Sequence, residues 1–336
     1  MAETLPPRKK PDPLRVIALV ATLACLAMLP FGAQIFDLGS LPSFATRIVI
    51  LAIAAASLNL ILGYGGLVSF GHAAFYGVGG YVVGILFAHA RWNAPLWGII
   101  PGVTDMAITL PLAVVICGLL ALVLGAISLR TSGVQFIMIT LAFAQMIFFL
   151  FVSLKTYGGD DGLSIRRRNE FFGFDVRDDV TFYYVSLAFA LLWFGFMARL
   201  VNSRFGLVLR GIRQSERRMS TIGISTYRYK LVAYVIAGAG AGLAGALMAN
   251  YAKFVSPDML NWMQSGELMI MVILGGVGTL SGPAIGAAVL LILESVLAAW
   301  TEHWAVILGP ILVLVVLFWR GGINGLIAVL RGGRRE

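Results

Sequence analysis

Long apolar runs, separated by short polar segments, dominate the sequence. A helix that crosses the ~30 Å hydrocarbon core of a bilayer needs about 20 such residues. Glycines interrupt the runs at 66–88 and 265–282, which favours a broken or re-entrant helix in each. The pattern predicts an all-α, polytopic helical membrane protein with eight to ten transmembrane helices and Gly-interrupted segments. The candidate spans are 14–33, 43–62, 66–88, 106–128, 134–154, 182–201, 230–252, 265–282, 284–301 and 305–319.

Charged residues are scarce and unevenly distributed among these runs. They make up 12% of the 336 residues, whereas soluble domains carry about 25%. Lys and Arg gather before residue 16, in 202–230 and after residue 319, and the net charge is +9. Because cytoplasmic segments of membrane proteins collect Lys and Arg, the N- and C-termini are both predicted to be cytoplasmic. The net charge then reflects topology, and nothing in the pattern predicts nucleic-acid binding.

This topology divides the chain into a membrane domain and two tails. The predicted parts are a cytoplasmic N-terminal tail (1–13), a transmembrane domain (14–319) and a cytoplasmic C-terminal tail (320–336). Within the membrane domain, 155–181 is expected to be a periplasmic loop and 202–230 a cytoplasmic loop. A loop as long as 155–181 is usually functional or ordered by a partner.

The basic loop 202–230 is predicted to contain one helix, from residue 204 to residue 222. The loop is too charged to enter a bilayer, so it is expected to form a binding surface for a soluble partner. Arg210, Arg213 and Arg217 recur at three- and four-residue intervals, which predicts that they share one helical face. That face either meets acidic groups on a partner or is a solvated surface beside anionic lipid.

No constellation for catalysis or metal binding is evident. The three histidines lack metal-ligand spacing, and Cys25 and Cys117 lie in apolar runs, where buried small side chains are the simplest interpretation. The phosphate-binding loop of ATPases needs a Gly-Lys pair followed by Ser or Thr, and none of the lysines follows a glycine. The chain is therefore not expected to be an enzyme, and no cofactor or metal of its own is predicted.

Three polar residues in apolar surroundings are candidates for lining a solute path. Ser69 and His72 belong to the glycine-rich stretch 63–81, whose small residues permit close helix packing or unwound backbone beside a cavity. Glu294 is an acid deep inside an apolar run, and intramembrane ionisable groups are functional candidates by default. Tight packing with interhelical hydrogen bonds is the alternative for all three. Weaker polar candidates, each expected to join helices, are Asn59, Gln135, Gln145 and Asn250.

Two glycine-rich segments share a spacing that suggests two related halves. Residues 62–69 and 274–281 agree at four of eight aligned positions. Gly-interrupted segments in corresponding positions of two halves point to a transport site, because broken helices present backbone groups to a cavity. Chance similarity between glycine-rich helices is the alternative, and the spacing does not decide whether such a repeat is inverted.

Five separated motifs occur in the order found in one family of transport proteins. Over residues 43–319 they make the chain resemble the LivM-type permease of branched-chain amino acid ABC importers. A urea- or amide-type permease of the same superfamily is the nearest alternative, and the third motif fits the amino-acid branch better. The motifs are GYGGLVSFGHAAFYGVGGY (63–81), ITLAFAQM (139–146), YGGDDGL (157–163), GLVLRGIRQSERRMSTIGISTYRYKLVAYVIAGAGAGLAGAL (206–247) and LGGVGTLSGPAIGA (274–287).

The resemblance implies a multi-pass subunit of the bacterial inner membrane that works within an assembly. The implied partners are a second, LivH-type permease, two cytoplasmic ATPases that bind ATP and Mg, and a periplasmic substrate-binding protein. The loop 202–230 is then the ATPase-coupling element. Gly206, Glu216 and Gly223 stand where importers usually have a Gly-bounded helix with an acid. The sequence Glu216-Arg217-Arg218 departs from the usual Glu-Ala-Ala, which leaves the individual contacts open.

Other classes of protein stay open from the residues alone. An ion- or proton-driven secondary transporter of small solutes would need no soluble partner, but it usually carries more than one intramembrane acid. A membrane enzyme or a structural subunit is the remaining alternative. The sequence does not identify the solute. Members of the family that the chain resembles transport leucine, isoleucine and valine, but also other amino acids, amides and small carboxylates.

Overall fold

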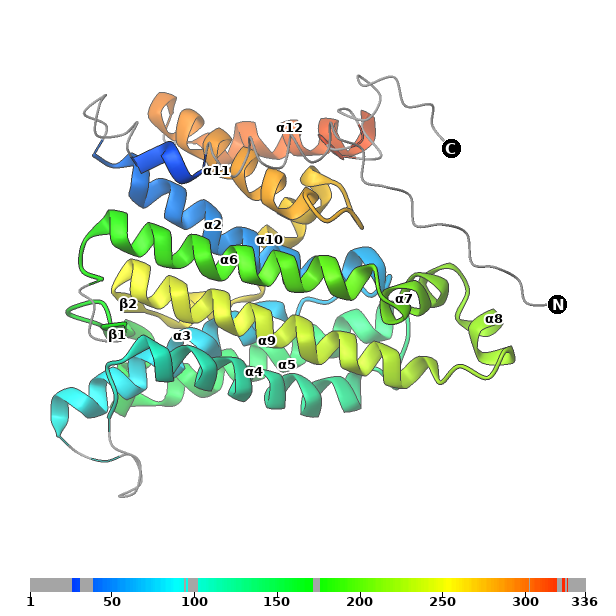
Figure 1. Ribbon diagram of the computed structural model, residues 1–336, viewed down its shortest axis with the longest axis horizontal. Helices are drawn as coiled ribbons and strands as arrows, with labels where there is room; N and C mark the ends of the chain where they lie inside the picture. Colours follow the sequence, from blue (N-terminus) through cyan, green and yellow to red (C-terminus); the bar gives the residue numbers. More distant parts are fainter. Residues whose placement is uncertain are drawn as a thin grey trace.

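Helices make up nearly all the regular structure of the computed structural model (Figure 1). It describes residues 26–30, 39–93, 95, 102–171, 176–301, 303–318, 322–323 and 325. The α-helices are α2 (Leu41–Asn59), α3 (His72–Trp92), α4 (Met106–Ser128), α5 (Val134–Ser153), α6 (Asp179–Val201), α7 (Arg204–Gln214), α8 (Glu216–Thr221), α9 (Thr226–Ala252), α10 (Trp262–Gly275), α11 (Gly282–Trp300) and α12 (Trp304–Phe318). The short elements are a π turn η1 (Leu60–Tyr64), the 3₁₀ turns η2 (Lys155–Tyr157), η3 (Gly159–Asp161) and η4 (Pro257–Leu260), and the strands β1 (Leu163–Ser164) and β2 (Phe254–Val255).

Within the described residues, seven helices are long and apolar enough to cross a membrane, and α10 is a shorter apolar helix. The seven are α2 with η1, α3, α4, α5, α6, α9 and α11. The all-α, polytopic membrane fold predicted from the sequence is confirmed. The predicted span 14–33 lies outside the described residues except for 26–30, which are helical, and the tails 1–13 and 320–336 lie outside them almost entirely.

The helices divide into a buried centre and an apolar outer layer. The α2 span is 89% buried within the protein, whereas α5 is 22% buried and exposes large apolar side chains such as Met138 and Phe149. Helix α9 packs against α2, α3 and α4 (Figure 1). In water such exposed apolar area would be costly, so it fits a lipid or protein partner within a bilayer.

Glycines allow α3 and α9 to pack backbone against backbone. A Cβ atom added at Gly245 of α9 would collide with the carbonyl of Tyr76 on α3, and one at Gly79 would collide with the carbonyl of Gly242. Helix association in membranes depends on such close packing of small residues. The glycine-rich stretch of α3 is therefore explained in part by packing.

Both glycine-interrupted runs are broken in the structure. After η1 the chain is non-helical from residue 65 to residue 71, and α3 begins only at His72. In the run 265–282, α10 ends at Gly275, the chain is non-helical from residue 276 to residue 281, and α11 begins at Gly282. The break before α3 is enclosed by α10, where the Ser265 hydroxyl donates to the carbonyl of Phe70 (2.7 Å) and accepts from the Ala73 amide (2.8 Å). Non-helical backbone at membrane depth requires this kind of protein enclosure.

The basic loop forms two helices, and the prediction of one continuous helix over 204–222 is wrong. Ser215 has an extended conformation (φ −161°, ψ 104°) that ends α7 and starts α8. Its hydroxyl accepts a hydrogen bond from the Arg218 amide (3.4 Å), as N-cap residues do. Because the helix breaks here, Arg217 does not continue the helical face of Arg210 and Arg213. The prediction that the three arginines share one face is therefore also wrong.

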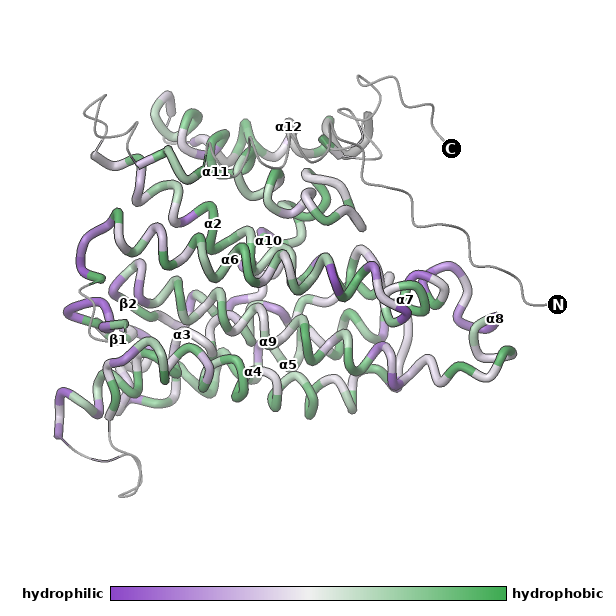
Figure 2. The backbone as a smooth tube through the Cα atoms, in the orientation of Figure 1, coloured by the Kyte–Doolittle hydropathy of each residue, from purple (hydrophilic) through white to green (hydrophobic). Residues whose placement is uncertain are grey.

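The bundle has two polar ends. Helices α7 and α8 lie at one end, and β1, β2 and the loop between α5 and α6 lie at the other (Figures 1 and 2). Strand β1 pairs antiparallel with β2, with Leu163 opposite Val255. Hydrophilic residues gather at both ends and apolar residues fill the length between them (Figure 2). These are called the α7 end and the strand end below.

Candidate functional site

The predicted path residues Ser69 and His72 lie together in the interior. Both are fully buried, and the Ser69 hydroxyl accepts a hydrogen bond from the Gly71 amide (3.2 Å). The His72 ring lies edge-on to Phe75 and to Tyr234 of α9, and its nitrogens have no hydrogen-bond partner among the described residues. The structure thus encloses both residues within the protein.

Glu294 belongs to a separate polar group near the strand end of the bundle. Its carboxylate lies 3.7 Å from the Arg47 guanidinium of α2. Glu267 of α10 interacts electrostatically with both residues and accepts a hydrogen bond from Gln264 (3.0 Å). The structure thus places Glu294 with Arg47 and Glu267, three charged groups on three helices, rather than with the buried Ser69 and His72.

The two glycine-rich segments that share a spacing meet at the α7 end. Asn59, the last residue of α2, donates a hydrogen bond to the Thr279 carbonyl (2.8 Å) and accepts one from the Gly278 amide (2.9 Å). A Cβ atom at Gly63 would lie 2.5 Å from the Gly278 nitrogen, so only glycine fits. Gly278 itself has a φ of 80°, a conformation that side chains disfavour. We call this contact between 59–66 and 276–279 the glycine crossing.

Helix α7 lies directly against the glycine crossing. The Arg213 guanidinium donates to the Gly63 carbonyl through Nη1. Arg210 instead donates to the carbonyl of Gly206, one turn earlier in α7, and to that of Val201, the last residue of α6 (both 3.3 Å). Of the arginines predicted to grip a soluble partner, these two therefore bind their own chain.

Helix α8 is tied to α9 by an ion pair. The Lys230 ammonium lies 2.6 Å from the Glu216 carboxylate. Partial burial raises the pKa of Glu216. The hydrogen bond and charge of Lys230, together with a hydrogen bond from Thr226, lower the pKa by a larger amount, so it lies below its usual value. Arg217 and Arg218 are exposed on α8, and Gly223, with a φ of 85°, forms the turn into α9.

A family model for the permease component of branched-chain amino acid transport systems matches residues 40–317. The chain belongs to this family. The match covers the whole of α2 to α11, and the multi-pass helical architecture agrees with a membrane permease. No solved structure matches the chain.

Curated relatives of the chain include proteins named LivM and LivH. The chain is 27% identical over 300 residues to the high-affinity branched-chain amino acid transport permease LivM of Salmonella typhimurium, and the match covers 82% of this chain and 68% of the relative. It is also 27% identical over 278 residues to a probable LivM of Methanocaldococcus jannaschii, covering 73% and 77%. A shorter match, 31% identical over 125 residues, links 37% of the chain to 40% of LivH of Escherichia coli.

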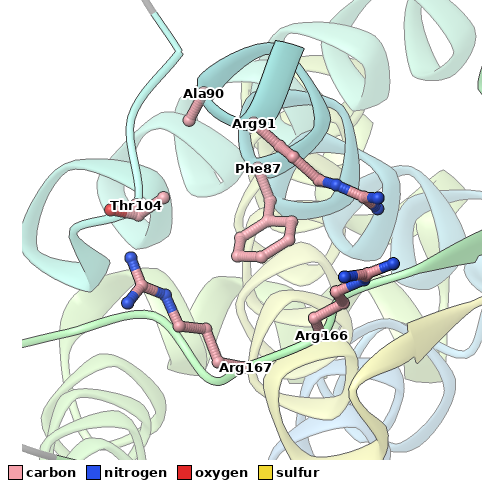
Figure 3. Close-up of a pocket in the computed structure, with 6 residues that line it drawn as sticks. All are labelled: Phe87, Ala90, Arg91, Thr104, Arg166 and Arg167. Atoms are coloured by element: carbon pink, nitrogen blue, oxygen red, sulfur yellow. The ribbon is translucent and has the colours of Figure 1, made fainter. Parts of the chain in front are cut away.

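The strand end of the permease carries a pocket of about 440 Å³ lined by arginines. Phe87 lies between Arg167, which extends toward Thr104, and the guanidinium groups of Arg91 and Arg166 (Figure 3). An adjoining cavity of about 160 Å³ shares the two loop arginines and adds Lys253. The ion pairs in the described part of the chain leave Arg91, Arg166 and Arg167 without a carboxylate. This surface therefore suits an acidic partner.

Sequence reasoning missed two elements of this arrangement. Glu267 lies within the predicted span 265–282, but Glu294 was taken as the significant membrane acid. Arg166 and Arg167 lie in the predicted loop 155–181, where six acids accompany the cations, and Arg91 follows the predicted span 66–88. The signal for Glu267 was available as an acid inside an apolar run, whereas the arginine pocket depends on which acids pair within the fold.

Proposed function

We propose that the protein is the permease subunit of an ATP-binding-cassette importer that carries branched-chain or related amino acids across the bacterial inner membrane. Membership of the permease family and the seven apolar helices support this function. The LivM and LivH relatives are named as permeases of one transport system. A second, LivH-type permease is the natural partner of this subunit in the membrane.

The observation that carries the proposal is the short helix pair α7–α8 at one polar end. Helix α7 buries Leu209 and Ile212 against the bundle, while α8 exposes Arg217 and Arg218. A soluble ATPase reaches exposed cations of this kind and pairs them with acids. In this proposal the α7 end is cytoplasmic and two ATPase subunits bind ATP and Mg. The α7–α8 pair of this chain is the surface to which those subunits bind.

The solute enters at the strand end and leaves at the α7 end. A periplasmic binding protein delivers it, and Arg91, Arg166 and Arg167, which form no ion pair with a described acid, provide the permease's attraction for that protein's acids. Between the two ends, the charged group around Glu294 and the buried pair Ser69 and His72 are the proposed polar lining. Because Ser69 and His72 are enclosed in the present structure, the path opens only after the helices rearrange.

Charge reversal on α8 tests this function. We expect Arg217→Glu combined with Arg218→Glu to lower amino-acid uptake at least about tenfold, because like charges then face each other across the ATPase interface. Uptake and ATP hydrolysis are measured on the complete importer in proteoliposomes with its binding protein. Hydrolysis and co-purification of the ATPases should persist, which shows an uncoupled but assembled complex.

The matched control reverses an exposed arginine that lies beyond α8. Arg228→Glu, in the first turn of α9, changes the charge equally and should leave uptake near normal. Normal uptake in the Arg217 and Arg218 variant would refute the coupling role. Uphill transport by the purified permease alone under an ion gradient would refute the importer and favour a secondary transporter.

A further inference from the structure

The glycine crossing joins two helix ends that the sequence separates by more than 200 residues. Helix α2 passes through the π turn η1 and ends at Gly65, and α10 ends at Gly275. Helix ends leave carbonyls without intrahelical partners. Asn59 connects the two ends through both atoms of its side-chain amide. One side chain therefore joins the two helix ends directly.

A single side chain from α7 lies across this crossing. Besides binding the Gly63 carbonyl, Arg213 fills the space that side chains would occupy at two glycines of left-handed conformation. A Cβ atom at Gly66 would lie 2.9 Å from Arg213 Cγ, and one at Gly278 would lie 3.0 Å from its Nη1. The arginine thus touches both broken segments, and both are glycine where it does so.

Helix α7 has few other attachments of this kind. Among the described residues, its other side-chain hydrogen bond to the bundle is the one from Arg210 to the Val201 carbonyl at the end of α6. Helix α8 is held to α9 by Glu216 and Lys230. The contact of Arg213 is accordingly the polar link between α7 and the segments that lead into α3 and out of α10.

We propose that Arg213 is a positioning residue that couples movement of α7 to the glycine crossing and so controls the opening of the permease at its α7 end. The inference rests on the proposed function, because it takes the ATPases as the source of that movement. When α7 shifts, the guanidinium draws the Gly63 carbonyl with it, and Asn59 carries the displacement to 278–279. The crossing then opens or closes the α7 end.

The test compares two reporter sites in the complete importer, with Cys25 and Cys117 replaced. One nitroxide label is placed at Leu207, which is exposed on α7, and another at Val277 in the crossing. In the otherwise unchanged permease, the electron paramagnetic resonance spectra of both labels should change when the importer is trapped with ATP and vanadate. In Arg213→Ala the Leu207 label should still respond and the Val277 label should not, and uptake should fall about tenfold, as expected for loss of a hydrogen bond to a charged group.

Two further variants separate positioning from mere stability. Arg213→Lys keeps a cationic donor and should restore part of the Val277 response. Arg204→Ala removes a guanidinium from the same helix at an exposed position and should leave both responses intact. A full Val277 response in Arg213→Ala overturns the inference while the proposed function stands. A Leu207 label that is silent in the unchanged permease overturns the coupling role of α7 and, with it, the inference.

Discussion

At the scale of single residues, the ion pair between Glu216 and Lys230 makes the attachment of α8 sensitive to pH. The pKa of Glu216 is lower in the folded protein than in the unfolded chain, because Lys230 and Thr226 stabilise the carboxylate more than burial destabilises it. A depressed pKa of this kind contributes stability that is fully present above the unfolded value of about 4.3. That contribution is lost as the pH falls through the lower, folded value.

We therefore predict that α8 loosens from α9 in mild acid. A nitroxide label at the exposed Ser220 should become more mobile as the pH falls below about 4.3, measured by electron paramagnetic resonance on the purified permease. In Glu216→Gln the label should be mobile at neutral pH and should change little on acidification. Equal pH profiles in the two proteins would show that the ion pair does not hold α8.

Sequence reasoning at this scale identified residue types better than their partners. Glu294 was a candidate because a charge in an apolar run is conspicuous, but its neighbours Arg47 and Glu267 come from helices far apart in the sequence. Asn59 was expected to join helices, and it does so at the glycine crossing. Arg213 was expected to face a partner, whereas the fold turns it toward Gly63.

At the scale of secondary-structure elements, the close approach of α3 and α9 depends on glycine. Gly245→Ala should destabilise the permease by about 1–3 kcal/mol, the usual cost of overpacking, because the new methyl group collides with the Tyr76 carbonyl. Thermal unfolding of the purified permease in detergent measures the effect. Gly195→Ala on α6 has nothing within 4 Å and is the matched control. Equal unfolding temperatures in the two variants would contradict the packing argument.

The sequence predicted most helices at this scale, because a bilayer demands long apolar runs and little else produces them. It failed at Ser215, where the basic segment is helical on both sides and hydropathy gives no signal. The available clue was local: Ser215 precedes an acid and caps α8 through its hydroxyl. The breaks before α3 and after α10 were anticipated, because their glycines tolerate unwound backbone.

At the scale of the whole molecule, the shared spacing of 62–69 and 274–281 has a physical counterpart. Each segment carries a helix end, and the two ends meet at the α7 end of the bundle. Spacing alone left chance similarity open, because glycine is common in membrane helices. The contact through Asn59 shows that the two segments lie against each other, although only the fold could reveal that Arg213 of α7 contacts both.

The orientation of the bundle is the remaining whole-molecule prediction, and it follows from the uneven distribution of charge. Exposed Asp160, in η3 at the strand end, and exposed Ser220, on α8 at the opposite end, are suitable positions for single cysteines after Cys25 and Cys117 are replaced. A charged thiol reagent that does not cross the inner membrane should label Asp160→Cys in spheroplasts. Ser220→Cys should react only after the membrane is opened, because the basic α7–α8 segment is expected on the cytoplasmic side. The reverse pattern would place α8 in the periplasm, where no ATPase reaches it, and would refute both the predicted topology and the coupling role.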